Sequence, residues 1–377
     1  MTGLMLLLNA ATLFTAAQGV GALEGPALSW RSTADLGHRE LGEPRDPRFR
    51  LLSLADRWLG LIAVDGKAQL RSPTGKWSDV IDLPIERVVA AASDGSAILV
   101  AGETPGPDES RRALVLSLGI DGHVHARWEM PVSLLQSLAA GQNGRWATGY
   151  IGFNGHQGPK VLWALLSGGK IEPRDEIPTI VEDGQDVVPW RVFLYLGPSQ
   201  EKIFCVPQTC QHDLPCHYAL CYRRDKVAWN KYGRWVARPV LCGDYLLEQE
   251  LPMTFVRFLP HSHSRTVIRR ISNGTKVGSV ATGPDALLSC AGPGTFVAAD
   301  TSVRAMSLSS GRRQWSVPIR AGHAVAVAQA GDCTIALTDR DEMMSICSVN
   351  GRPVVATTGS RPQEKASFSG ATTPAKP

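Results

Sequence analysis

Eight cysteines, all between residues 205 and 347, are the side chains whose spacing points most directly to a chemistry. Cys205 and Cys221 are equally far from Asp213 in the sequence, and so are Cys210 and Cys216. In an antiparallel hairpin centred on Asp213, each cysteine faces its counterpart, and facing residues at non-hydrogen-bonded sites lie near disulfide distance. The spacing predicts two nested disulfides, Cys205–Cys221 and Cys210–Cys216.

The other four cysteines predict two further disulfides. Cys333 and Cys347 flank a turn centred on Arg340, so we expect them to face each other in the same way. Cys242 and Cys290 are 48 residues apart, and each lies early in its own stretch of apolar runs. We therefore expect this pair to join the inner strands of neighbouring structural repeats.

A metal site and a redox role are the alternatives for the first group of cysteines. Cys210, His212, Cys216 and His217 offer thiolate and imidazole groups of the kind that tetrahedral zinc accepts. No C-x₂-C spacing is present, however, and the hairpin symmetry accounts for all four cysteines of this stretch without a metal. An even number of cysteines behind a candidate export signal also favours disulfides.

Histidine and carboxylate side chains gather in the segments that we expect to be loops. Five of the nine histidines lie in three such segments. A metal-binding or pH-sensitive site is one interpretation. Solvated loop side chains are the other, which we favour because ligation requires a defined geometry. The candidate ligand- or partner-binding residues are the polar side chains of these loops: Asp108, Glu109, Asn154, His156, Lys160, His212, Asp213, His217, His261 and His263.

The elements that would position these side chains form a repeat. Asp121-Gly122 lies between two apolar runs and is a strong hairpin signal, because a type I′ turn requires the positive φ that glycine adopts easily. Gly75 and Gly169 lie 47 residues on either side of Gly122, and a proline follows each of the three glycines nine residues later. A repeat of ~40–50 residues built from hairpins predicts the blades of a β-propeller.

The turn signals give the number of repeats. Glycines at 75, 122, 169, 274, 311 and 351 mark six of them, and Arg224-Asp225 stands where a further glycine is missing. The sequence therefore predicts an all-β fold, a seven-bladed β-propeller, with six or eight blades as alternatives, in a single domain over residues 23–361. We expect Leu28–Arg31 to be available as a strand that closes the ring.

The loops between the second and third strands of the repeats are the expected recognition surface. They are long in the second to fifth repeats, and loops on a rigid scaffold are where recognition usually occurs. In the fifth repeat we expect Val240–Leu247 as the first strand and Phe255–Leu259 as the second. The four long loops then lie side by side on one face of the ring.

Both ends of the chain differ in composition from the repeats. Residues 1–22 are expected to be a signal peptide, with an apolar segment at Leu4–Ala17 and small residues at Val20-Gly21-Ala22. No Lys or Arg precedes the apolar segment, so a buried strand or an anchor remains an alternative. Residues 362–377, rich in Pro, Ser, Thr, Ala and Lys, are expected to be a disordered tail. The expected location is secreted or periplasmic, with no membrane span in the mature chain.

The segment Ser302–Trp315 resembles the repeat of PQQ-like β-propellers, which runs from an apolar strand through a turn glycine to a tryptophan. Leu116–Trp128 and Leu70–Trp77 are looser copies. That family includes quinoprotein dehydrogenases and non-catalytic assembly scaffolds. The chain lacks the adjacent cysteines of the catalytic members, and its size is similar to that of amine dehydrogenase heavy subunits, in which the quinone sits on a small partner subunit.

The function that the sequence favours is an exported, non-catalytic scaffold that binds a protein or another ligand through the long loops. No G-x-S-x-G, P-loop, H-E-x-x-H or Rossmann motif is present. Net charge is +4, from 39 basic and 35 acidic residues, which is too even to predict a nucleic-acid partner or an acidic membrane surface. No cofactor is predicted. The alternative is a metal- or quinone-dependent periplasmic enzyme, or the propeller subunit of an amine dehydrogenase-like complex.

Overall fold

The computed structural model describes nineteen segments of the chain, and everything that follows concerns these residues. They are 26–28, 48–106, 111–130, 134–140, 146–153, 159–167, 170–174, 180–182, 185–187, 192–197, 201–209, 217–223, 226–232, 234–235, 238–251, 264–283, 285–320, 322–349 and 352–358. The expected signal peptide and C-terminal tail lie outside them. No helix of the described segments is long and apolar enough to cross a membrane.

The described residues are almost entirely β-strand, in six four-stranded sheets, one five-stranded sheet and one two-stranded ribbon. In each four-stranded sheet, strands that are consecutive in the chain pair antiparallel. The first three sheets are β1 (Phe49–Ser53), β2 (Leu59–Ala63), β3 (Lys67–Arg71) and β4 (Ile81–Asp82); β5 (Arg87–Ser93), β6 (Ala97–Pro105), β7 (Arg111–Gly119) and β8 (Val124–Met130); and β9 (Leu134–Ala140), β10 (Trp146–Phe153), β11 (Pro159–Ser167) and β12 (Lys170–Arg174).

The C-terminal part of the chain continues this order after the ribbon of β13 (Ile180–Glu182) and β14 (Gln185–Val187). The next sheet has β15 (Phe193–Leu196), β16 (Lys202–Thr209), β17 (His217–Arg223) and β18 (Lys226–Tyr232). The five-stranded sheet has β19 (Arg234–Trp235), β20 (Val240–Cys242), β21 (Tyr245–Leu251), β22 (Arg265–Arg270) and β23 (Lys276–Ala281). The last two have β24 (Leu287–Cys290), β25 (Thr295–Ala299), β26 (Ser302–Ser307) and β27 (Arg313–Pro318), and then β28 (Ala324–Ala330), β29 (Cys333–Thr338), β30 (Met343–Val349) and β31 (Arg352–Thr357).

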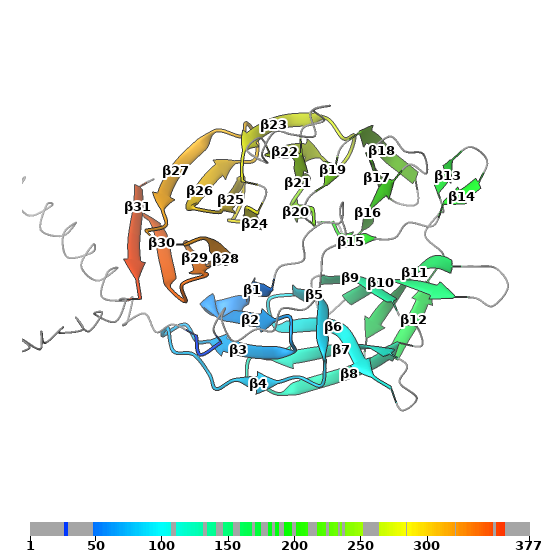
Figure 1. Cartoon of the computed structure of the whole chain (residues 1–377), viewed down its shortest axis with the longest axis horizontal. Coiled ribbons are helices and arrows are strands. Elements are labelled where there is room, and N and C mark those ends of the chain that lie inside the picture. Colours follow the sequence, from blue (N-terminus) through cyan, green and yellow to red (C-terminus); the bar gives the residue numbers. More distant parts are fainter. Residues whose placement is uncertain are drawn as a thin grey trace, which may run out of the picture.

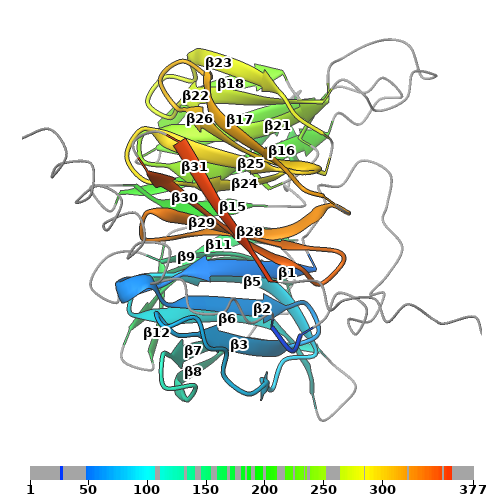
Figure 2. The same ribbon diagram turned by 90° about the vertical axis from the view of Figure 1, so that its left-hand side faces the viewer.

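The sheets are arranged radially around a centre, which confirms the expected β-propeller (Figure 1). The first strand of each sheet lies innermost: β1 contacts β5 and β28, β9 contacts β5 and β15, and β24 contacts β20 and β28. The fourth strands lie on the perimeter. Figure 2 shows the sheets from the side, with their strands running between the two faces of the disc.

The blades are less regular than the repeat count predicts. Six sheets are regular four-stranded blades, which is the number given above as an alternative to seven. The fifth repeat forms the five-stranded sheet, in which the short strands β19 and β20 pair with opposite ends of β21. Val240–Leu247 is therefore not one strand: the chain turns at Gly243, whose φ is 59°. Pro239, which has no N–H for a ladder, precedes β20. The expected strand Phe255–Leu259 lies outside the described residues.

Turns of positive φ connect the strands where glycine was expected. Gly75, Gly122, Gly274 and Gly311 have φ between 67° and 94°, a region that L side chains rarely adopt. At the Asp121-Gly122 turn, the Asp121 carboxylate accepts a hydrogen bond from the His123 N–H at 3.0 Å and contacts His125 Nε2 at 2.9 Å. The His123 N–H and the His125 side chain lower the pKa of Asp121. The hairpin that organises the second repeat is confirmed.

Apolar clusters fill the spaces between neighbouring sheets. Trp128 of β8 packs with Val115 of its own sheet and with Leu138, Ala164 and Leu166 of the next. Trp315 of β27 lies partly buried against a cluster shared with the last sheet, and Trp229 of β18 packs with residues of the five-stranded sheet. The tryptophans at the outer strands therefore act as fillers between blades, as their position in the repeat predicts.

The ring closes between the first and last sheets without a shared strand. All four strands of the last sheet come from Ala324–Thr357, so Leu28 does not lend it a strand, and residues 29–31 lie outside the described part. Leu28 instead joins an apolar cluster that contains Leu59 of β2 and Leu337 of β29. Its N–H donates to the buried Oε1 of Gln69 at 2.9 Å. The segment before β1 thus lies in the seam and touches both sides of it.

Candidate functional site

Each of four consecutive sheets carries a long loop between its second and third strands, as expected. The loops join β6 to β7, β10 to β11, β16 to β17 and β21 to β22. Two candidate residues lie on their supporting strands: Lys160 of β11 pairs in register with Gly152, and His217 of β17 pairs with Thr209. Their side chains are not described. The other candidate residues lie outside the described segments: Asp108, Glu109, Asn154, His156, His212, Asp213, His261 and His263.

Each of two disulfides joins neighbouring strands within a single sheet, at the positions that the symmetric spacing predicts. Cys205 of β16 and Cys221 of β17 are register partners, with 4.2 Å between their Cα atoms, and the bond joins the two strands that carry the loop over residues 210–216. Cys333 and Cys347 are register partners on β29 and β30. Both predicted pairings are confirmed. Cys210 and Cys216 lie outside the described residues, so their pairing stays a prediction.

The third disulfide ties two sheets together. Cys242 of β20 and Cys290 of β24 are bonded, with 5.5 Å between their Cα atoms. The pair joins the inner strands of neighbouring sheets, as the 48-residue spacing predicted. Since β20 has only three residues and covers one end of β21, this bond holds a short strand in the inner ring. Within the described residues no group of three or more His, Cys, Asp or Glu side chains is arranged to hold a metal ion.

A buried cluster of charged side chains, which the sequence reasoning missed, lies beneath the loop between β21 and β22. Glu248 and Glu250 of β21 are 0% and 4% exposed, and Arg269 of β22 is 8% exposed. Arg269 Nε donates to Glu248 Oε2 at 2.5 Å, and Nη2 donates to Glu250 Oε1 at 3.2 Å. Arg265 Nη2 lies 3.5 Å from Glu250 Oε2. The signal in the sequence was Glu248-Gln249-Glu250 in an otherwise apolar strand.

Burial raises the pKa of Glu248 to about 8, although the Arg269 guanidinium opposes the shift and the neighbouring Glu250 carboxylate adds to it. Two carboxylates share one close guanidinium, and burial disfavours the charge that remains. Glu248 Oε1 has no hydrogen-bond partner among the described residues. Close by, burial also raises the pKa of the Tyr195 hydroxyl, which donates to the Pro239 carbonyl at 2.6 Å. Burial therefore favours the protonated form of Glu248.

The guanidinium of Arg269 also links the five-stranded sheet to its neighbour. It lies 5.9 Å from the ring centroid of Trp229 of β18, and Nη1 donates to the Gly274 carbonyl at 3.3 Å. Gly274 has a φ of 67°, and a Cβ there would lie 2.4 Å from Trp229 Cγ. Only glycine fits this turn against the tryptophan. Glu248, Glu250 and Arg269 are thus packed among the described residues, while Arg265 is exposed.

A second polar network joins the five-stranded sheet to the sheet that follows it. Gln249 Nε2 donates to the Gly283 carbonyl at 2.6 Å, and the Gly283 N–H donates to Asp300 Oδ2 at 3.3 Å. Asp300 also pairs with Arg304, whose Nη1 donates to the Ala281 carbonyl at 3.0 Å. These contacts fix the segment that follows β23. Polar contacts therefore hold the five-stranded sheet on both sides.

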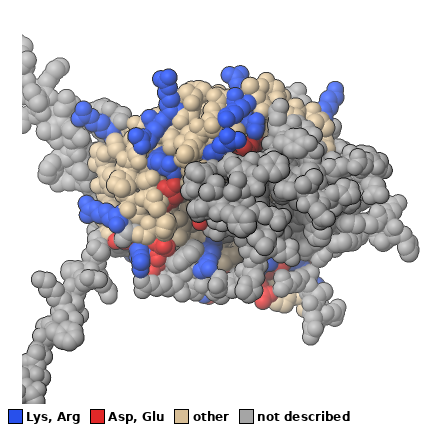
Figure 3. Space-filling view, turned by 45° about the horizontal axis from the view of Figure 1, so that its top comes forward, with Lys and Arg blue, Asp and Glu red and all other residues tan. Residues whose placement is uncertain are grey.

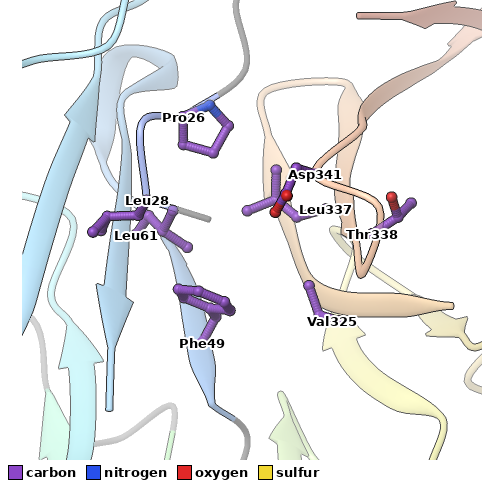
Figure 4. A pocket seen from close by; sticks show the side chains of 8 residues that line it. All are labelled: Pro26, Leu28, Phe49, Leu61, Val325, Leu337, Thr338 and Asp341. Atoms are coloured by element: carbon purple, nitrogen blue, oxygen red, sulfur yellow. The ribbon is translucent and has the colours of Figure 1, made fainter. Parts of the chain in front are cut away.

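A small apolar pocket lies at the seam between the first and last sheets (Figure 4). Pro26, Leu28, Phe49 and Leu61 line one side, and Val325, Leu337, Thr338 and Asp341 line the other. Its cavity volume is about 10 Å³, which holds about one water molecule. Small-molecule sites are usually ~300 Å³ or larger. The pocket is a packing gap at the seam, too small for a ligand.

Comparisons with known proteins support the fold. No family model matches the chain, and no curated protein matches it in sequence. A computationally designed protein, Ika8, is similar in structure, with a TM-score of 0.52, 10% identity, and coverage of 81% of this chain and 98% of that one. The β-propeller domain of Cps50 (Swd1) from Myceliophteria thermophila has a TM-score of 0.51 and 9% identity, covering 78% and 95%.

The WD40 β-propeller domain of Doa1 has a TM-score of 0.51 and 10% identity, with coverage of 80% of this chain and 93% of that domain. Identities near 10% show a shared fold and carry no information on ligands. The PQQ-like family is therefore not shown by these comparisons. What they establish, together with the radial sheets, is that the described chain is a β-propeller with WD40-like neighbours.

Proposed function

We propose that this chain is a non-catalytic β-propeller scaffold that binds a protein partner through the four long loops, which we call the loop face. The loop face comprises the connections β6–β7, β10–β11, β16–β17 and β21–β22. The proposal rests on one observation: four consecutive sheets each bear a long loop between their second and third strands. WD40 and other β-propeller domains share the fold, which supports a binding role by analogy.

The base of the loop face is built to stay rigid. The Cys205–Cys221 bond joins the two strands that carry one loop, and the Glu248–Arg269–Glu250 cluster joins the two strands that carry another. Neither group is open to substrate from the described sides. Rigid support under variable loops suits recognition, because a pre-organised surface loses less entropy on binding.

In this proposal the five-stranded sheet completes the ring beside the six regular blades. It lies in the ring between the sheets of β15 and β24, and β20 contacts β24. Its strands β21, β22 and β23 follow the order of the regular blades, and β19 and β20 together take the place of one inner strand. Tryptophans between blades fit a PQQ-like origin for the repeat, which stays part of the proposal.

Export completes the proposal. Residues 1–22 act as a signal peptide, residues 23–361 form the propeller domain, and residues 362–377 form a tail. Three disulfides in the described residues are consistent with an oxidising compartment, which supports a secreted or periplasmic location. Mass spectrometry of the N-terminus of the secreted chain tests the cleavage after Ala22.

Affinity capture from the native host tests the binding role. We compare the wild-type chain with a loop variant, His212→Ala, Asp213→Ala and His261→Ala, and with a control, Lys76→Ala and His123→Ala, which changes turns on other connections. A specific partner is expected on the wild type and the control and to be lost from the loop variant. Equal capture by all three would contradict the proposal, and so would a metal or quinone found in the purified protein by elemental analysis and absorption spectroscopy.

A further inference from the structure

A basic residue recurs just after the turn between the third and fourth strands of each sheet. The turn glycine is followed at once by Lys76, His123, Lys170, Arg312 and Arg352, Asp225 is followed by Lys226, and Gly274 is followed two residues later by Lys276. All seven side chains are exposed. We call these seven residues the basic crown: Lys76, His123, Lys170, Lys226, Lys276, Arg312 and Arg352.

The topology places the basic crown on one face of the disc. In every sheet the first strand is innermost and the strands pair antiparallel, so all third-to-fourth-strand turns lie at the same face. The long loops join second to third strands and therefore lie at the opposite face. The turn at Gly311 packs on strands of the preceding sheet: a Cβ on Gly311 would lie 3.5 Å from Ile268 Cδ1 of β22 and from Val280 Cγ2 of β23.

The basic crown is densest where β23 and β27 meet. Arg270 and Lys276 flank one turn, Arg312 and Arg313 follow the next, and all four are exposed. Within the described residues no crown side chain forms an ion pair with a carboxylate. Figure 3 shows more Lys and Arg than Asp and Glu side chains on the described part of the side that it views. An unpaired positive rim attracts anions.

Connections on both faces carry acidic residues: on the face of the crown, Asp56, Asp244 and Asp332 lie in inner connections between first and second strands. In the last two sheets the connections of the opposite face mix both signs: Asp300 pairs with Arg304, and Arg340 lies in the sequence between Asp339 and Asp341. Basic residues on outer strands also discourage edge-to-edge pairing. That role requires no particular end of the strand, whereas here the basic group occupies the same end in seven sheets.

We propose that the basic crown docks this face of the disc on a planar anionic surface, the headgroups of acidic phospholipids in a bilayer. Equivalent positions of a ring lie near one plane, so all seven side chains can reach a flat surface together. A linear polyanion would contact only part of the perimeter. Each Lys or Arg near an anionic bilayer strengthens binding roughly fivefold. Docking in this way leaves the loop face free.

Co-sedimentation with vesicles tests the docking surface. The full chain is mixed with phosphatidylcholine vesicles that contain or lack phosphatidylglycerol, at low and high salt. Binding is expected only with phosphatidylglycerol and is expected to weaken with salt, because ions screen exposed charges over ~10 Å at 0.1 M. Equal binding to both kinds of vesicle, or binding that salt leaves unchanged, would overturn the proposal.

Charge-reversal variants locate the contact. Lys276→Glu with Arg312→Glu is expected to weaken vesicle binding at least ~25-fold, since two contacts are lost. The matched control, Arg320→Glu with Arg340→Glu, reverses two exposed charges on the opposite face and is expected to bind as the wild type does. Lys170→Glu with Lys226→Glu, from another part of the crown, is expected to repeat the loss if the first variant folds poorly. Equal losses in crown and control variants would contradict the proposal.

The nature of the anion is tested in the same buffer. Heparin and duplex DNA are titrated against the chain in competition with phosphatidylglycerol vesicles. The planar surface is expected to compete better than either linear polymer at equal charge concentration. If a polymer displaces the vesicles and its binding is lost with Lys276→Glu and Arg312→Glu, the basic crown is a polyanion site and the lipid proposal is wrong.

Discussion

At the scale of single residues, the carboxyl group of Glu248 is the most unusual group of the described chain. It is fully buried, shares one guanidinium with Glu250, and has its pKa raised to about 8, mainly by burial. Breaking a buried ion pair by removing one partner is costly because it leaves an uncompensated charge. We infer that the cluster stabilises the pairing of β21 with β22 more strongly when Glu248 carries a proton.

The pH dependence of stability follows from that shift. The pKa of Glu248 lies above its ordinary value of 4.5, so the stability that protonation contributes is complete below that value and is lost as pH rises through about 8. We expect the free energy of unfolding of the wild type to fall between about pH 5 and about pH 9. Glu248→Gln should remove most of this fall, as measured by denaturant unfolding at each pH.

The control for that measurement is Glu250→Gln, which removes the neighbouring carboxylate. Because the Glu250 carboxylate raises the pKa of Glu248, removing its charge should lower that pKa. The loss should therefore begin at lower pH than in the wild type. A wild-type stability that is constant over this pH range would contradict the assignment.

At the scale of elements, the disulfides and hairpins could be predicted from the sequence, because both depend on local spacing. The positions of Cys205 and Cys221 about a common centre fix their register, and Asp121-Gly122 fixes a turn. The split of Val240–Leu247 into β20 and β21 could not be predicted in the same way. The apolar run is continuous through Gly243, and the break depends on which strand pairs with each half of β21.

The bond between Cys242 and Cys290 predicts a specific loss of stability. It closes a loop of 48 residues, for which the chain-entropy model gives a contribution of about 4 kcal/mol. Replacing both cysteines with serine should lower the free energy of unfolding by roughly that amount in denaturant titrations. Amide exchange should rise first in β20 and β24, because the bond joins these two strands.

Replacing Cys333 and Cys347 with serine is the comparison for that change. That pair closes only 14 residues within one sheet, so the same model gives a smaller loss, and exchange in β20 should stay as in the wild type. Equal losses for both pairs, with exchange unchanged in β20, would show that the bond between sheets does not hold the short strand in place.

At the scale of the whole molecule, the ring is held at its seam by the segment before β1. Leu28 is 6% exposed, packs against both the first and the last sheet, and its N–H is bonded to Gln69. Ser53 of β1 also donates to the Gln329 carbonyl of β28. The radial arrangement could be predicted from the repeats. The way the ring closes could not, because it depends on contacts between residues nearly 300 positions apart.

Leu28→Ala tests the seam. Truncating a buried leucine costs about 3 kcal/mol, and here the cavity would open between two sheets. We expect lower stability in denaturant and faster amide exchange in β1 and β28 than elsewhere. Leu99→Ala, inside the second sheet, should lower stability to a similar extent without a selective change at the seam. A uniform rise in exchange with Leu28→Ala would contradict a role in closure.

The chemistry of the proposed binding surface was the least predictable part. The candidate residues lie on long loops, and their mutual geometry does not follow from spacing in the sequence. Glu248 was missed because strand alternation alone did not show that both faces of β21 are buried. What the sequence did indicate is which connections carry the long loops. The supporting strands of the second to fourth repeats are where it placed them, whereas in the fifth repeat β21 precedes the loop.

The binding account is tested most directly by amide hydrogen exchange of the chain with and without its captured partner. The account predicts protection in the loops of the loop face, at residues 107–110, 154–158, 210–216 and 252–263, and no protection at the turns that carry Lys76, His123 and Lys276. Protection at those turns with unchanged exchange in the four loops would contradict it.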